Sequence, residues 1–218
     1  MENKVNYQRL LEEIIRDNAG KRPRLLLHSC CAPCSSAVLA YLSEYFRITL
    51  FYYNPNISTE AEFMHRAEEL RRLVCEMGLS KIEVRVPEYC HQEFLDIAKG
   101  LEQEPERGAR CVKCFHQRLT RTAEEMQEWN TAHPEEAFDY FCTTLTISPL
   151  KDAQLLNRIG MQLAEQYGLR FLPSDFKKKG GYQRSIELSR QYALYRQDFC
   201  GCEFSQREAA ERRQLDKK

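Results

Sequence analysis

Three short cysteine clusters constrain this chain more than any other feature. They contain seven of its ten cysteines: Cys30, Cys31 and Cys34, then Cys111 and Cys114, then Cys200 and Cys202. Thiolates two or three residues apart can turn toward one centre without deforming the backbone, which suits iron–sulfur clusters and structural zinc. The pattern therefore predicts a fold that holds a sulfur-ligated centre.

Length and composition indicate an ordinary globular protein. The 218 residues are 43% hydrophobic and 29% charged, and we expect one α/β domain over residues 1–218. The first residues are polar and amphipathic, and no apolar run approaches the roughly 18 residues that a membrane span needs. We therefore expect a cytoplasmic protein. In a reducing compartment ten cysteines indicate metal binding or catalysis rather than a disulfide framework.

The formal net charge is zero, but one segment is basic. Between residues 171 and 196 only Asp175 and Glu187 are acidic, against six basic residues: Lys177, Lys178, Lys179, Arg184, Arg190 and Arg196. Most such runs are solvated faces of a protein. This one is also compatible with a polyanionic partner such as a nucleic acid.

Strand-like and helix-like patterns alternate along the chain. Expected strands cover 24–29, 48–53, 81–86, 138–145 and 169–172. Expected helices cover 33–45, a segment from a capping box at Thr59 and Glu62 to near Gly78, and a segment that Ser148 caps and that runs to Gly168. Such alternation predicts a mostly parallel sheet with helices on both faces, where ligands bind beyond the carboxyl ends of the strands. Cys30 and Cys31 follow the first strand and lie at that edge.

Each cysteine cluster has an alternative reading. Cys30, Cys31 and Cys34 lie in a strand-to-helix turn that favours thiolate, although buried structural cysteines would give the same pattern. Cys111 and Cys114 open a helical stretch and are either ligands of a shared centre or half of a zinc knuckle. A disulfide between Cys200 and Cys202 would close a small, strained and easily reduced ring, and the alternative is a further pair of metal ligands. The remaining cysteines are read as core or incidental: Cys75, Cys90 and Cys142.

Five motifs together resemble the QueH family, the cobalamin-independent epoxyqueuosine reductases. They cover about a third of the chain, in the family's order: LLLHSCCAPCS (25–35), FYYNPNI (51–57), CVKCFHQRL (111–119), TTLTISPLKD (143–152) and DFKKKGGYQRSIELSRQYALYRQDFCGCEFS (175–205). The last is a C-terminal basic block that also carries the Cys200/Cys202 pair. The resemblance implies a PP-loop-like or Rossmann-like fold, although HSCCAPCS replaces the nucleotide-binding loop of PP-loop enzymes. Nucleotide hydrolysis is therefore not expected.

The resemblance also implies a function and a set of site residues. The enzyme would reduce the epoxide of epoxyqueuosine to queuosine at the wobble position of tRNAs with a GUN anticodon, the Asp, Asn, His and Tyr acceptors, as the last step of queuosine biosynthesis. A [4Fe-4S] cluster would be held by Cys30, Cys31, Cys111 and Cys114, with Cys200 and Cys202 as the redox-active pair and an unknown electron donor. Some members hold an additional mononuclear iron, for which Cys34 and the Cys200/Cys202 thiols are candidate ligands.

Polar residues of the basic block are further candidates for the site. Arg184 and the lysines would contact phosphates, and tyrosines would stack on bases or donate protons. These candidates are Asp175, Tyr182, Arg184, Tyr192 and Tyr195, and the tyrosines can equally belong to a helix core.

Two other functions fit parts of the pattern. A thioredoxin-like thiol oxidoreductase would use Cys31 and Cys34 but would leave the other two cysteine pairs without a role. A zinc-stabilised RNA-binding module would use the cysteines without catalysis. Iron, sulfide and zinc content distinguish the three.

Overall fold

The computed structural model describes residues 4–215 and contains a four-stranded, all-parallel sheet. The strands are β1 (Arg24–His28), β2 (Arg47–Phe51), β3 (Glu83–Arg85) and β4 (Tyr140–Thr143). Their spatial order is β3-β2-β1-β4, so β1 pairs with β2 on one side and with β4 on the other. The predicted α/β fold with a parallel sheet is confirmed. Residues 1–3 and 216–218 of the expected 1–218 domain lie outside the described residues.

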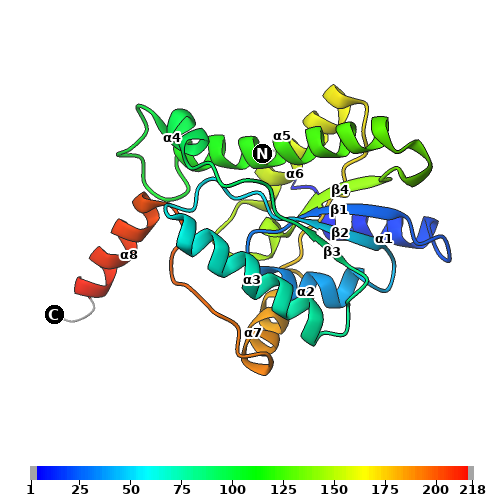
Figure 1. Ribbon diagram of the computed structural model, residues 1–218, viewed down its shortest axis with the longest axis horizontal. Helices are drawn as coiled ribbons and strands as arrows, with labels where there is room; N and C mark the ends of the chain where they lie inside the picture. The colour runs from blue at the N-terminus through cyan, green and yellow to red at the C-terminus, as the bar shows by residue number, and fades with distance from the viewer. Residues whose placement is uncertain (1–3, 216–218) are drawn as a thin grey trace.

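Helices cover both faces of this sheet (Figure 1). They are α1 (Tyr7–Asp17), α2 (Ala32–Leu42), α3 (Glu60–Glu76), α4 (Gln92–Ala98), α5 (Ala109–Ala132), α6 (Ala153–Tyr167), α7 (Gly181–Gln191) and α8 (Glu203–Leu215), with short 3-10 helices η1 (Pro134–Glu136) and η2 (Thr144–Ile147). Helices α2, α3 and α7 lie on one face of the sheet, and α5 and α6 lie on the other (Figure 1). None of the helices in residues 4–215 is both long and apolar enough to cross a membrane.

The core is split into two layers by the alternation of side chains along the strands. Leu25 and Leu27 of β1 pack with residues of α1, α2 and α3, whereas Leu26 packs with residues of α5 and α6. All three leucines are fully buried. A central parallel strand has no solvent-facing side, which explains why β1 is a continuous apolar run rather than an alternating one.

Three predictions of secondary structure are wrong. The fifth strand predicted at 169–172 is reduced to a single bridge between Phe141 and Phe171. The next backbone N–H that would continue this ladder, that of Ser174, donates to Asn157 Oδ1 at 2.9 Å instead. Helix α6 begins at Ala153 rather than after Ser148, because the Asp152 carboxylate accepts the backbone N–H groups of the first turn. The fourth strand predicted at 138–145 is too long, because β4 ends at Thr143 and residues Thr144 and Leu145 belong to η2.

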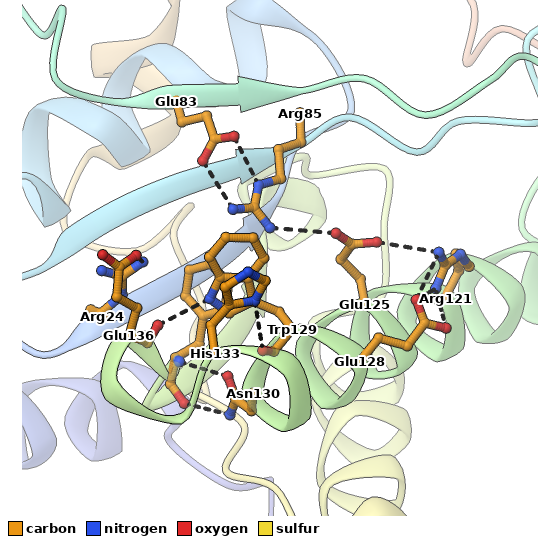
Figure 2. Close-up of polar contacts among 11 residues, drawn as sticks. Arg24, Glu83, Arg85, Arg121, Glu125, Glu128, Trp129, Asn130, His133 and Glu136 are labelled. Atoms are coloured by element: carbon orange, nitrogen blue, oxygen red, sulfur yellow. Dashed lines mark hydrogen bonds and ion pairs between the residues drawn. The ribbon is translucent and has the colours of Figure 1, made fainter.

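The edge strand β3 is tied to α5 by a stack of charged and aromatic groups (Figure 2). The Arg85 guanidinium lies 3.8 Å from the Trp129 ring centroid, and His133 stacks on Trp129 with 3.8 Å between the ring centroids. Arg85 also pairs with Glu83 at 3.0 Å and with Glu125 at 3.5 Å. Cation–π and ion-pair contacts thus fix the position of α5, whose other end carries Cys111 and Cys114.

Candidate metal centre and active site

The strand order opens a crevice at the carboxyl end of β1. From β1 the chain moves outward through β2 and β3, and then returns to β4 on the opposite side. The loops that leave β1 and β4 therefore diverge, and such a switch point is where open α/β sheets bind ligands. The backbone N–H of Cys30 spans this opening by donating to Thr144 Oγ1 at 3.3 Å.

Three thiols come together directly after β1. The Sγ atoms of Cys30, Cys31 and Cys34 all lie within 4.8 Å of one another, and those of Cys30 and Cys31 are 3.9 Å apart. Cys31 is the N-cap of α2 and Cys34 lies in the first turn, where Pro33 favours helix initiation. Residues three apart share one face of a helix, so local backbone geometry brings Cys34 to this group.

Hydrogen bonds among the three thiols shift their pKa values in opposite directions. Hydrogen bonds from Cys31 and Cys34 lower the pKa of Cys30 well below its usual range. The same hydrogen bonding to Cys30 raises the pKa of Cys31 to about 12 and also raises that of Cys34. One thiolate, that of Cys30, is thus stabilised by two thiol donors, and this is a starting state suited to capturing a cation.

A second cysteine group lies where α5 begins and the C-terminal block ends. Cys111 and Cys114 occupy the first two turns of α5, and the buried Cys114 packs with Cys202, Phe94 and Phe204. Burial, together with the nearby Cys200, Cys111 and Cys202, raises the pKa of Cys114 to about 12, although the Arg118 cation lowers it. The structure therefore brings together two cysteine pairs that are 86 residues apart in the sequence.

The sequence predicts one ligand set of Cys30, Cys31, Cys111 and Cys114, but the group with metal-ligand spacing in the structure is a different one. Within residues 4–215 the three-thiol group after β1 is the only set with metal-ligand spacing, and it contains Cys34 instead of Cys111 and Cys114. All described cysteines are free thiols, including Cys200 and Cys202. The ligand roles of Cys111 and Cys114 and the redox role of the Cys200/Cys202 pair stay predictions.

Two cationic side chains, Arg118 and Lys151, lie near both cysteine groups. Neither is among the candidate site residues predicted from the sequence. Arg118 is 1% exposed and donates to Asn54 Oδ1 at 2.5 Å. Burial would lower the pKa of Arg118, but the nearby Cys114, Cys200 and Cys30 raise it. Burial also lowers the pKa of Lys151, and there Cys200, Cys30 and Cys34 raise it. Both residues lie in motifs quoted above, which is the signal that could have identified them.

These groups line one cavity of about 280 Å³. Its walls include the three thiols after β1, the two cations and Cys200, together with Tyr182, Arg196 and Phe199. Cys200 is partly exposed to this cavity, whereas its partner Cys202 is buried on the side of Phe204. The arrangement offers thiols, fixed positive charge and a phenol around one small space.

The other candidate residues of the basic block lie at several different places in the structure. Asp175 is buried and pairs with Lys177 at 2.8 Å in a neighbouring cavity, and Arg184 pairs with Glu187 on the surface of α7 at 3.1 Å. Tyr195 donates to Glu62 at 3.1 Å, and Tyr192 packs against the core. Among the named tyrosines of this block, Tyr182 is the one that lines the cysteine cavity.

The remaining cysteines and His28 have no place in the cavity wall. Cys75 and Cys90 are exposed, and Cys142 is buried in β4 with its thiol 3.1 Å from the Leu172 carbonyl. His28 is buried, with Nε2 3.0 Å from the Tyr53 carbonyl and Nδ1 2.9 Å from the Thr143 hydroxyl. Arg118 Nε also lies 3.4 Å from His28 Nε2, so these polar neighbours of the ring belong to the protein interior.

The donor set fits a thiolate-bound metal. Soft sulfur ligands select iron–sulfur centres or zinc over hard cations. Two thiolates on one tetrahedral metal with bonds of about 2.3 Å lie roughly 3.8 Å apart. The 3.9 Å between Cys30 and Cys31 matches that spacing without rearrangement.

Comparison with known proteins gives one consistent result. The family model described as "Epoxyqueuosine reductase QueH" matches residues 25–208. Proteins with that name are similar over most of their length. The one from Staphylococcus epidermidis is 41% identical over 93% of this chain and 85% of its own. The one from Haemophilus influenzae is 40% identical over 85% of this chain and 73% of its own. The one from Thermotoga maritima is 32% identical over 86% of this chain and 93% of its own. The cysteine crevice thus belongs to an oxidoreductase, and the chain is a member of the QueH family of epoxyqueuosine reductases.

Proposed function

We propose that this enzyme reduces the epoxide of epoxyqueuosine at the wobble position of GUN-anticodon tRNAs to the alkene of queuosine, with the help of an iron–sulfur centre. The observation that carries the proposal is the group of three thiols within 4.8 Å of one another, which lines the same cavity as Cys200, Lys151 and Tyr182. Family membership supports the reaction, and the thiols support the choice of a sulfur-ligated metal.

The reaction requires electrons and protons in equal number. Conversion of an epoxide to an alkene breaks two carbon–oxygen bonds, consumes two electrons and two protons, and releases one water. Oxidation of two thiols to a disulfide releases two electrons and two protons. The dithiol form of Cys200 and Cys202 therefore balances one turnover, after which an external reductant must restore it.

Cys30, Cys31, Cys111 and Cys114 would hold the cluster, and Cys34 is placed to contribute a further ligand. When bound, such a centre supplies single electrons at a potential set by its ligands and surroundings. Cys34 and the thiols of the Cys200/Cys202 pair are also the residues that would hold an additional mononuclear iron.

The other residues of the cavity wall have roles that follow from their charge. Lys151 carries its positive charge beside Cys200 and Cys30, where it stabilises a departing oxygen anion. The Tyr182 phenol lines the same space and is placed to donate a proton to that oxygen. Buried Arg118 keeps a fixed charge behind the thiolates.

An assay on anaerobically purified protein tests the proposal. Iron, sulfide and zinc are quantified, and tRNA that contains epoxyqueuosine is treated with the reduced protein and analysed by nucleoside mass spectrometry. We expect iron with sulfide, and conversion to queuosine. Zinc without iron, or unconverted epoxyqueuosine beside turnover of a generic disulfide, would overturn it.

A further inference from the structure

A large basic cavity lies beside the cysteine cavity. It measures about 1190 Å³ and is lined by the first turn of α1, the start of α6 and residues 175–179. Lys151 lines both cavities, so a group bound in the basic one would lie next to the cysteine site. Lys4, Arg158 and the lysines 177–179 add positive charge to its wall, against the carboxylates of Asp152 and Asp175.

Internal ion pairs leave one lysine of the basic block available. Lys177 pairs with Asp175 at 2.8 Å, and Lys179 pairs with Glu12 at 2.5 Å. Lys178 is exposed and has no carboxylate partner in residues 4–215. It is therefore the lysine of this run that can bind an external anion without first breaking an ion pair.

Lys178 also lines a third cavity, which is aromatic. This groove of about 470 Å³ lies between α1, α2 and α7 and is lined by Tyr41, Tyr45 and Phe176, with Arg184 and the Glu12 carboxylate among its other residues. The rings of Tyr41 and Tyr45 meet edge to face, with 5.8 Å between their centroids, and Tyr45 is 37% exposed. An exposed aromatic ring beside two cations is the combination that binds a base and its phosphates.

Helix α2 connects this groove to the reaction site. Cys34 and Tyr41 are seven residues apart, two turns of one helix, so they lie on the same side about 10 Å from each other. Ile147 lines both the cysteine cavity and the groove. The cysteine cavity, the basic cavity and the aromatic groove are therefore neighbours that share Ile147, Lys151 and Lys178.

From this arrangement we propose that the three cavities form the path of the substrate RNA strand. The inference rests on the proposed function, because it takes the modified base to be in the cysteine cavity. An unpaired nucleotide beside that base stacks in the groove on Tyr45, and Lys178 binds a phosphate between the two. The groove replaces Tyr192 and Tyr195 as the stacking surface, since those side chains contact the protein's own core and Glu62.

Binding of a labelled anticodon stem-loop RNA at several salt concentrations tests the path. Lys178→Gln should reduce the slope of log affinity against log salt by roughly 0.7 to 0.9, the value of one phosphate contact. Tyr45→Leu should weaken binding by about 5- to 150-fold without changing the slope, because stacking is uncharged. Tyr45→Phe keeps the ring and should bind as the wild type does. Lys99→Gln, an exposed lysine beside α4, is the matched control and should change nothing.

A second measurement uses the unaltered protein. RNA with 4-thiouridine next to the wobble position should crosslink on irradiation to the peptide that contains Tyr41 and Tyr45. Crosslinks confined to other segments, wild-type affinity of Tyr45→Leu, or a full salt slope in Lys178→Gln would each overturn the path. If the wild type binds the RNA as described but leaves epoxyqueuosine unconverted in tRNA, the proposed function fails and the path does not.

Discussion

The Sγ atoms of Cys30 and Cys31 lie 3.9 Å apart where β1 ends and α2 begins. Both residues lie in the turn between His28, the last residue of β1, and Ala32, the first of α2, so their side chains converge instead of pointing to opposite faces as in a regular strand. Cys34 joins them from the first turn of α2. This convergence turns a linear motif into a site that can hold a metal, and the predictions below depend on it.

The first prediction concerns the second cysteine group. Cys111→Ser should remove most of the iron and sulfide and the visible absorption, because serine oxygen is a poorer ligand than thiolate for an iron–sulfur centre. Metal analysis of anaerobic protein measures this. Cys75→Ser removes an exposed thiol elsewhere and should keep the full metal content. Full cluster content in Cys111→Ser would contradict the ligand assignment.

The second prediction separates the terminal pair from the metal centre. Cys200→Ser and Cys202→Ser should each abolish epoxide reduction while much of the iron stays bound, because either change removes one of the two thiols that store electrons. Nucleoside mass spectrometry and iron analysis of the same samples give both values. If iron falls as far as it does in Cys31→Ser, the pair is a set of ligands instead.

The third prediction concerns the glycine between those thiols. Gly201 has a φ of 131°, and an added Cβ would lie 3.1 Å from Ile57 and 3.2 Å from Arg66. Gly201→Ala should therefore strain the loop by about 1–3 kcal/mol and displace Cys200 and Cys202. We expect activity to fall tenfold or more, because a strain energy of this size corresponds to about a factor of ten in a rate. The fold should be retained. Gly20→Ala also has a positive φ but meets no atom within 4 Å, so it should leave turnover unchanged.

The fourth prediction is a pH dependence of stability. Burial, and then the Arg118 cation, lower the pKa of His28 to about 3, whereas an unfolded histidine has a pKa of about 6.5. Above about pH 6.5 the neutral ring contributes its full stability. As the pH falls toward about 3 the unfolded chain binds a proton that the folded protein does not. The free energy of unfolding then decreases by up to about 1.4 kcal/mol per pH unit.

Urea unfolding between about pH 7.5 and pH 5.5 measures this contribution. In His28→Gln the amide can still donate to the Tyr53 carbonyl and accept from Thr143, but it does not titrate. Its stability should therefore decrease less steeply on acidification than that of the wild type. Parallel curves for the two proteins would show that His28 is not the group responsible.

Local sequence patterns were sufficient for much of the fold. The apolar run at 24–29, the Thr59 side-chain cap of α3 and the strand-to-helix turn after β1 each depend on residues a few positions apart, and all three are present. Patterns failed where a competing interaction decided the outcome. Asp152 rather than Ser148 caps α6, and the Ser174 N–H donates to Asn157 instead of continuing the fifth strand beyond one bridge.

The sequence by itself determined which residues can bind metal, because thiol spacing and helix geometry act within one turn of the chain. Only the tertiary structure decided which cysteines meet. Cys114 lies beside Cys202, and Cys200 shares a cavity with Cys34, because the strand order 3-2-1-4 returns distant segments to the carboxyl end of β1. Arg118 and Lys151 acquire their roles in the same way. Their motifs mark the segments that contain them, but only folding places the charge of each residue among thiols from other parts of the chain.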